Sequence, residues 1–134
     1  MDDQYVLSTL QAEAWNQLGE GMIITDPQGT IRFVNRAAIE MHGVAELGVT
    51  TDEYSTTYNL LRVDGSEYLS KDLPLTRAVR DGEVVKNEVW LIDRPDGSRV
   101  HAEGSACRVH DADGKVLGAV LTLRDCTTRE GDLA

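Results

Sequence analysis

Three histidines and two cysteines are the side chains in this sequence with the widest chemical repertoire. His42, His101 and His110 could bind a metal or transfer protons, but no His-x-x-x-His or carboxylate spacing gathers them into a ligand set. Cys107 and Cys126 are too few for a thiolate zinc site or a disulfide scaffold. The sequence therefore predicts no metal centre.

The acidic residues could act as general acids or bases, but many of them lie in turn-forming segments. Examples are residues 26–29, 94–97 and 111–114, where aspartate serves turn geometry. The sequence has no Gly-rich phosphate loop, no nucleophilic serine motif and no evident pairing of a nucleophile with a base. We expect no enzymatic activity, and a small α+β enzyme is the less favoured alternative.

The charge balance bears on the partners of the chain. Its 134 residues include 13 Lys+Arg and 23 Asp+Glu, a formal net charge of −10. Such a charge repels phosphate backbones and anionic lipids, so we expect neither nucleic acid nor membrane as a partner. The longest apolar runs are strand-sized, and the Met1-Asp2-Asp3 start lacks the basic residues of a signal peptide. We expect a cytoplasmic protein.

Periodicity and turn signals predict the elements of the N-terminal half. Apolar residues at spacings of three and four predict an amphipathic helix over residues 5–18. Strand patterns on both sides of residues 26–29 predict a hairpin, after which Asn35 caps a short helix that ends at Gly43. Residues 49–68 follow no clear pattern, so we expect them to be irregular.

The C-terminal half predicts one helix followed by three strands. Pro74 suits the first turn of a helix over residues 73–81. Strands over 85–93, 98–109 and 115–124 are separated by two strong hairpin turns. The expected class is α+β, with a single antiparallel five-stranded sheet, short helices across one face and an N-terminal amphipathic helix.

The face assignment of the last three strands suggests a core with spare volume. With turn centres at residues 96–97 and 112–113, the middle strand presents very small side chains to the core. The helices either fill this volume or enclose it as a small-ligand cavity, and both alternatives remain open. The candidate cavity residues are Ala38, Met41, Val79, Asn87, Val89, Leu91, Ala102, Gly104 and Leu121.

The opposite face of the predicted sheet carries apolar side chains among charged ones. The helix over residues 5–18 has more apolar surface than a solvated helix exposes, so packing on this face is its simplest burial, within one subunit or between two. The candidate dimer-interface residues are Leu7, Leu10, Ala14, Trp15, Leu18, Trp90 and Ile92.

The order of these segments resembles the PAS family of sensory domains. The resemblance begins at residues 18–35, LGEGMIITDPQGTIRFVN, and continues at residues 72–83, DLPLTRAVRDGE. It ends at residues 118–130, where DCTTRE is similar to the Asp-Ile-Thr-x-Arg signature that closes many such domains, with cysteine in place of isoleucine. The resemblance implies an N-terminal dimerisation helix over 1–18, a PAS domain over 19–126 and a signal-exit segment over 127–134.

The resemblance also bears on cofactors. Haem-binding members use a histidine on the helix before the last three strands, and residues 73–81 contain none. Members that bond flavin through cysteine need an Asn-Cys-Arg-Phe-Leu type motif, and residues 37–49 contain no cysteine. We therefore expect neither haem nor cysteine-bonded flavin, and the cofactor is unknown.

The resemblance finally implies a function. Such a domain dimerises, binds a small ligand in its core in some members, and relays a signal to an effector such as a histidine kinase, a cyclase or a transcription regulator. A ligand-free interaction module is the alternative. The exit residues would be Asp125, Thr127, Arg129 and Glu130. We expect Asp125 to pair with Arg94 or Arg99 and so to hold the exit against the sheet.

Overall fold

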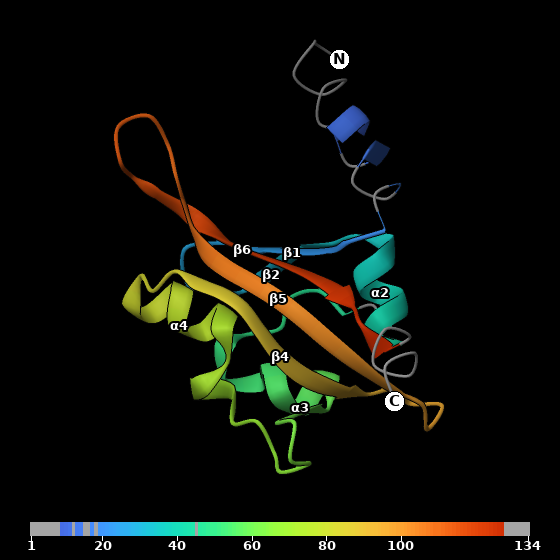
Figure 1. Cartoon of the computed structure of the whole chain (residues 1–134). Helices are drawn as coiled ribbons and strands as arrows, with labels where there is room; N and C mark the ends of the chain where they lie inside the picture. The colour runs from blue at the N-terminus through green and yellow to red at the C-terminus, as the bar shows by residue number, and fades with distance from the viewer. Residues whose placement is uncertain (1–8, 12, 15–16, 18, 45, 128–134) are drawn as a thin grey trace.

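A computed structural model represents the chain and describes residues 9–11, 13–14, 17, 19–44 and 46–127. Antiparallel strands form one curled sheet in the order β2-β1-β6-β5-β4-β3, and short helices lie across one face (Figure 1). The strands are β1 Gly21–Thr25, β2 Ile31–Val34, β3 Leu60–Leu61, β4 Val85–Asp93, β5 Arg99–His110 and β6 Val116–Asp125. The helices are α2 Arg36–His42, η1 Thr51–Glu53, α3 Tyr54–Tyr58, η2 Ser70–Asp72 and α4 Pro74–Asp81.

The α+β class and the single antiparallel sheet are confirmed, with six strands instead of five. The additional strand, β3, pairs with β4 at the edge of the sheet. It has only two residues, which is too short to produce the alternating pattern that identifies a strand in a sequence. No helix among the described residues is long and apolar enough to cross a membrane.

The β4–β5 hairpin closes with a three-residue loop, not with the two-residue turn that we predicted. The Arg94 N–H donates to the Ser98 carbonyl over 2.8 Å, and the Gly97 N–H donates to the Arg94 carbonyl over 2.9 Å. Gly97 occupies the third loop position with φ 91°, a left-handed conformation that glycine adopts without strain. The odd number of loop residues shifts the pairing of β4 with β5 by one residue.

This shift inverts the predicted faces of β4, because successive side chains of a strand point to opposite faces. Trp90 pairs with Ala102 and Ile92 with Val100, so both lie on the core face. Trp90 is 2% exposed and Ile92 is 0% exposed, and their assignment to the dimer interface is wrong. Val89 points outward and is 42% exposed.

The side chains of β5 and β6 lie on the predicted faces, because two shifts of one residue each change the pairing by two residues in total. The loop between the strands is again three residues long, with the Asp111 N–H donating to the Lys115 carbonyl over 2.9 Å. A bulge between Val109 and His110 adds a second shift, so Cys107 pairs with Val120 and not with Gly118. Ala102, Ala106 and Leu121 accordingly lie in the core as predicted.

The predicted cap of α2 and the predicted proline in the first turn of α4 are confirmed. The Asn35 side-chain oxygen accepts hydrogen bonds from the Ala38 N–H over 3.0 Å and from the Met22 N–H over 2.9 Å, which ties α2 to β1. The left-handed Gly43 ends α2, and Pro74 begins α4.

Residues 49–68 are folded, contrary to our expectation of an irregular stretch. Thr50 and Glu53 form a capping box that starts η1, and α3 and β3 follow. Tyr54, Tyr58 and Tyr68 lie in the core, each less than 5% exposed. The segment therefore supplies much of the helical layer that covers the sheet.

The N-terminal helix is described only in part. Residues 9–11, 13–14 and 17 are helical and exposed, with Leu10 63% exposed. They stand away from the sheet in Figure 1. Leu7, Trp15 and Leu18 lie outside the described residues.

Candidate functional site

A small cavity lies between the core face of the sheet and the helices. The space open to the centre of a water molecule is about 30 Å³. Its wall is mostly aliphatic and aromatic and consists of Ile23, Ile31, His42, Tyr54, Tyr58, Leu60, Leu73, Pro74, Leu75, Trp90 and Leu121. None of these side chains carries a carboxylate, an ammonium or a guanidinium group.

The volume beside the small side chains of β5 is largely filled. A Cβ atom placed on Gly104 would lie 2.7 Å from Cη2 of Trp90 and 2.7 Å from the Thr122 carbonyl oxygen. The Trp90 ring thus occupies the space that the small residues leave. It can do so because the observed register of β4 and β5 places Trp90 on the core face. The cavity is the remainder, and it lies toward α2, α3 and α4.

His42 is the titratable group with the most unusual environment in this wall. The side chain is 2% exposed, and its ring lies 4.7 Å from that of Tyr58. Nδ1 lies 2.8 Å from the Ala38 carbonyl oxygen, which can only accept, so Nδ1 carries the proton. Burial lowers the pKa of His42 to about 4, although the bond to Ala38 opposes this shift. The ring is therefore neutral at pH 7 and Nε2 is an acceptor.

Trp90 contributes a buried donor to the same wall. Its indole Nε1 is buried and has no hydrogen-bond partner among the described residues. Leaving such a group unpaired costs about 1–3 kcal/mol. By contrast, the Tyr54 hydroxyl donates to the Gly29 carbonyl and the Tyr58 hydroxyl donates to the Glu46 carbonyl over 3.1 Å. Burial raises the pKa of Tyr58 to about 12, so this hydroxyl stays protonated.

The outer sheet face, which is the face away from the helices, is apolar over a wide area. We define it by Met22, Ile24, Val89, Cys107, Val109, Leu117 and Val120. Leu117 is 50% exposed and Val109 is 37% exposed. Two hollows of about 290 and 350 Å³ lie on this face, and Val120 lines both.

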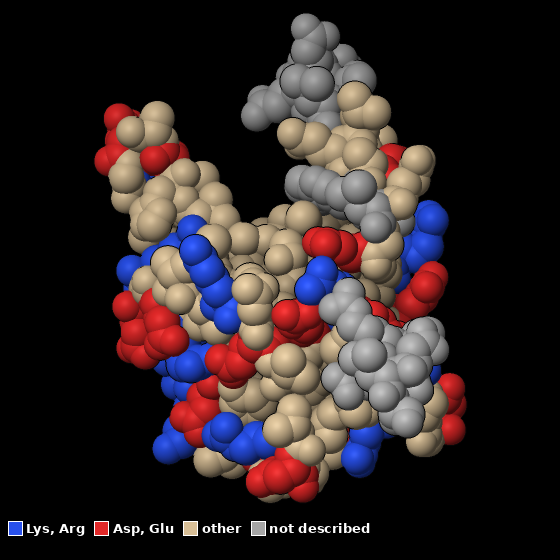
Figure 2. All heavy atoms as spheres, viewed as in Figure 1, with Lys and Arg blue, Asp and Glu red and all other residues tan. Residues whose placement is uncertain are grey.

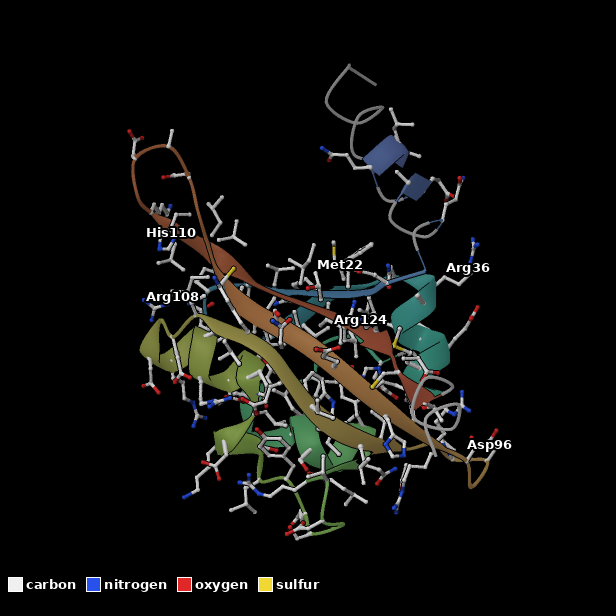
Figure 3. All side chains as sticks on the ribbon, viewed as in Figure 1. Met22, Arg36, Asp96, Arg108, His110 and Arg124 are labelled. Atoms are coloured by element: carbon white, nitrogen blue, oxygen red, sulfur yellow. The ribbon has the colours of Figure 1, made fainter. Side chains whose placement is uncertain are left out.

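Most charged groups of the sheet lie beside this apolar area, although Lys86 lines the larger hollow. Figure 2 shows a mostly uncharged surface between the β5–β6 hairpin and the N-terminal segment, with charges gathered farther along the strands. Figure 3 places Met22 and Arg124 on neighbouring strands, with His110 toward the hairpin tip and Asp96 at the opposite end of the sheet. Arg124 pairs with Glu103 over 2.7 Å.

The end of β6 is held by backbone contacts and not by the ion pair that we expected. Arg99 pairs with Asp93 over 2.6 Å, and Arg94 bonds to the Ser98 hydroxyl over 2.8 Å. No ion pair among the described residues includes Asp125, so the predicted pairing is wrong. The Asp125 carboxylate instead accepts from the Thr127 N–H over 2.8 Å, and Thr127 Oγ1 accepts from the His101 N–H over 2.8 Å.

This arrangement predicts a local effect of Asp125→Ala. The hydrogen bond between the Thr127 N–H and the Asp125 carboxylate is exposed, so the free energy of unfolding should change by less than about 1 kcal/mol. Loss of the carboxylate should raise amide hydrogen exchange at Thr127 several-fold, because the N–H loses its acceptor. Asp125→Asn retains an acceptor oxygen and serves as the control. Equal exchange at Thr127 in the wild type and Asp125→Ala would contradict this role.

The predicted site residues are only partly brought together. Of the cavity candidates, Leu121 lines the cavity. Ala38, Met41, Val79, Ala102 and Gly104 are in the core or packed against it but are not part of the cavity wall. Val89 and Leu91 lie on the face of β4 that points away from the cavity, and Asn87 lies at the bulge of that strand. The assignment of these three residues to the cavity wall is therefore wrong. Asn87 sits at the β4 bulge with φ 54° and an exposed side chain.

Among the predicted interface and exit residues, Leu10 and Ala14 are exposed, whereas Arg129 and Glu130 lie outside the described residues. Sequence reasoning missed His42, Tyr54 and Tyr58 as wall residues. The capping box before Tyr54 and the spacing of four to Tyr58 were the available signals for a buried helix.

Comparison with known proteins identifies the family. The model of the PAS fold matches residues 10–126, which is most of the chain. The chain therefore belongs to the PAS family. No curated protein matches it significantly.

Solved structures share the fold at low identity. The PAS domain of a protein from Colwellia psychrerythraea is 17% identical with a TM-score of 0.60, over 92% of this chain and 99% of that one. The Vibrio cholerae VqmA dimer is 18% identical with a TM-score of 0.64, over 90% of this chain and 52% of that one. An RNA-binding light-oxygen-voltage receptor is 18% identical with a TM-score of 0.64, over 97% of this chain and 36% of that one. The chain thus spans about half the length of VqmA.

These structures correct one expectation about partners. VqmA has a target DNA, which is absent from this structure of its dimer, and the light-oxygen-voltage receptor is RNA-binding, so our exclusion of nucleic acid as a partner is wrong. The net charge of one domain does not determine the charge of another part of a longer protein, and the matched region covers only 52% and 36% of those chains.

Proposed function

We propose that this chain is a signal-transduction module that dimerises, responds to a small ligand in its core and relays the signal to an effector beyond β6. A histidine kinase, a cyclase or a transcription regulator is the kind of effector that the family resemblance implies. The role involves no catalysis by the chain itself. The observation that carries the proposal is the apolar outer sheet face, which the described helices leave uncovered.

The occupant that we propose for this face is the N-terminal segment, residues 1–18, of a second copy. Leu10 and Ala14 are exposed in their own chain, so the helix has apolar surface to bury. The outer sheet face offers matching apolar hollows on β1, β5 and β6. Burying both surfaces in one symmetric contact removes two apolar patches from water. The described VqmA structure is also a dimer.

Replacement of Val120 by glutamate tests this interface. Val120 lines both hollows, and a carboxylate there would be buried without a partner in the dimer. We expect sedimentation to show a dimeric wild type and a Val120→Glu variant whose dissociation constant is at least about 100-fold higher.

Val63→Glu is the matched control, because it makes the same chemical change in an exposed turn where Val63 is 65% exposed. This variant should remain dimeric. A wild type that is monomeric at high micromolar concentration would contradict the proposal.

The small size of the cavity supports a second candidate function, that of a ligand-free interaction module. The space open to the centre of a water molecule is only about 30 Å³, which is what a largely filled core would leave. This candidate has the same dimer interface and differs only in the absence of a core ligand.

A further inference from the structure

We propose that the core cavity binds a small uncharged molecule that accepts a hydrogen bond from Nε1 of Trp90 and donates one to Nε2 of His42. This inference rests on the proposed function and gives its ligand a chemical class. It follows from the two polar groups in the wall, from the absence of charge there, and from the size of the space.

The donor is the indole N–H of Trp90. The side chain is 2% exposed and lines the cavity, and Nε1 has no hydrogen-bond partner among the described residues. Buried donors in native proteins are nearly always paired, so an unpaired one beside a cavity indicates a missing acceptor. A ligand with a carbonyl or hydroxyl oxygen would supply it.

The acceptor is Nε2 of His42. Nδ1 is committed as a donor to the Ala38 carbonyl, so the free lone pair of the neutral ring is on Nε2. His42 is 2% exposed and lines the same cavity as Trp90. A ligand N–H or O–H would satisfy this lone pair, and the ring would discriminate against ligands that can only accept.

The other wall residues restrict the charge of the ligand, and the volume of the cavity restricts its size. Apart from the aromatic residues it is built from Ile, Leu and Pro side chains, which offer no counter-ion. An ionised ligand would therefore be buried without a partner, so an uncharged one is favoured. A space of about 30 Å³ restricts the ligand to a few non-hydrogen atoms in this conformation.

Formamide and xenon are suitable probes because they differ in polarity while both are small. Formamide carries a carbonyl acceptor and an N–H donor, whereas xenon fills dry apolar cavities. The readouts in ¹⁵N and methyl NMR are the indole N–H of Trp90 and the methyl groups of Ile23 and Leu121. Trp90→Phe removes one of the two indole resonances and thereby assigns it.

We expect a saturable formamide-dependent shift of the Trp90 indole resonance, with half-saturation no tighter than about 1 mM for three non-hydrogen atoms. In Trp90→Phe, the methyl shifts should require at least fivefold more formamide. If Trp90→Phe does not fold, the wild-type indole shift decides alone. Methyl shifts with xenon and none with formamide would overturn the proposal, as would no response to either probe.

The same samples separate this inference from the proposed function. If the chain is dimeric by sedimentation but its Trp90 indole does not respond to formamide, the proposed ligand class is rejected and the ligand-free interaction module is retained. If the chain is monomeric but its Trp90 indole responds to formamide, the proposed ligand class is retained and the proposed dimeric module is rejected.

Discussion

Replacement of Trp90 by alanine is expected to lower the free energy of unfolding by about 3–5 kcal/mol. Trp90 is among the largest fully buried side chains, and its ring fills the space beside Gly104. Removing it would leave a void that the rigid strands of the sheet cannot close. Urea unfolding followed by far-UV circular dichroism measures the loss.

Val89→Ala is the control for this prediction. Val89 precedes Trp90 on β4, but its side chain is 42% exposed on the outer sheet face. Its replacement should cost less than about 1 kcal/mol, because little buried volume is lost. In the opposite register the two costs would be exchanged, so a large loss for Val89→Ala with a small loss for Trp90→Ala would contradict the fold.

Acidification is expected to destabilise the protein by about 2–3 kcal/mol between pH 7 and pH 4.5 through His42 alone. Burial lowers the pKa of His42 from 6.5 to about 4, so the unfolded chain binds a proton in this interval that the folded chain does not. Stability is therefore complete above pH 6.5 and is lost progressively as the pH falls to about 4. Urea unfolding at several pH values measures this slope.

His42→Gln removes the titratable group and should flatten the slope over this interval, whatever its effect on stability at pH 7. Carboxylates contribute in a different window. The Arg99 guanidinium lowers the pKa of Asp93 below 3.8, so its contribution disappears only at more acidic pH. An unchanged slope between pH 6.5 and 4.5 in His42→Gln would exclude His42 as its cause.

The sequence allowed the elements to be predicted well but not the loop geometry between strands. The hairpins around residues 26–29, 94–97 and 111–114 were identifiable because Asp and Gly at fixed offsets favour tight turns. Whether such a turn has two or three loop residues depends on the backbone conformation of Gly97, which the residue types alone do not fix. One residue was enough to place Trp90 on the wrong face.

The buried tyrosines explain why the cavity could not be located beforehand. Residues 49–68 lack a regular apolar pattern because three of the core side chains there are Tyr54, Tyr58 and Tyr68, which count as half-polar in a periodicity analysis. Their hydroxyls reach partners at the edge of the core while their rings fill it. The predicted cavity was therefore centred on β5, whereas the actual one is enclosed by α2, α3 and α4.

Photo-cross-linking from the outer sheet face tests the central claim, the seating of one copy's N-terminal segment on another, most directly. A benzoylphenylalanine at position 120 and an equal mixture of ¹⁴N- and ¹⁵N-labelled chains allow mass spectrometry to identify both the peptide captured and the chain it came from. We expect the position-120 peptide to be joined to a peptide from residues 1–18, with mixed-isotope pairs as abundant as same-isotope pairs. Cross-links to residues 1–18 in same-isotope pairs only, or no cross-link to that segment, would contradict the proposed dimer.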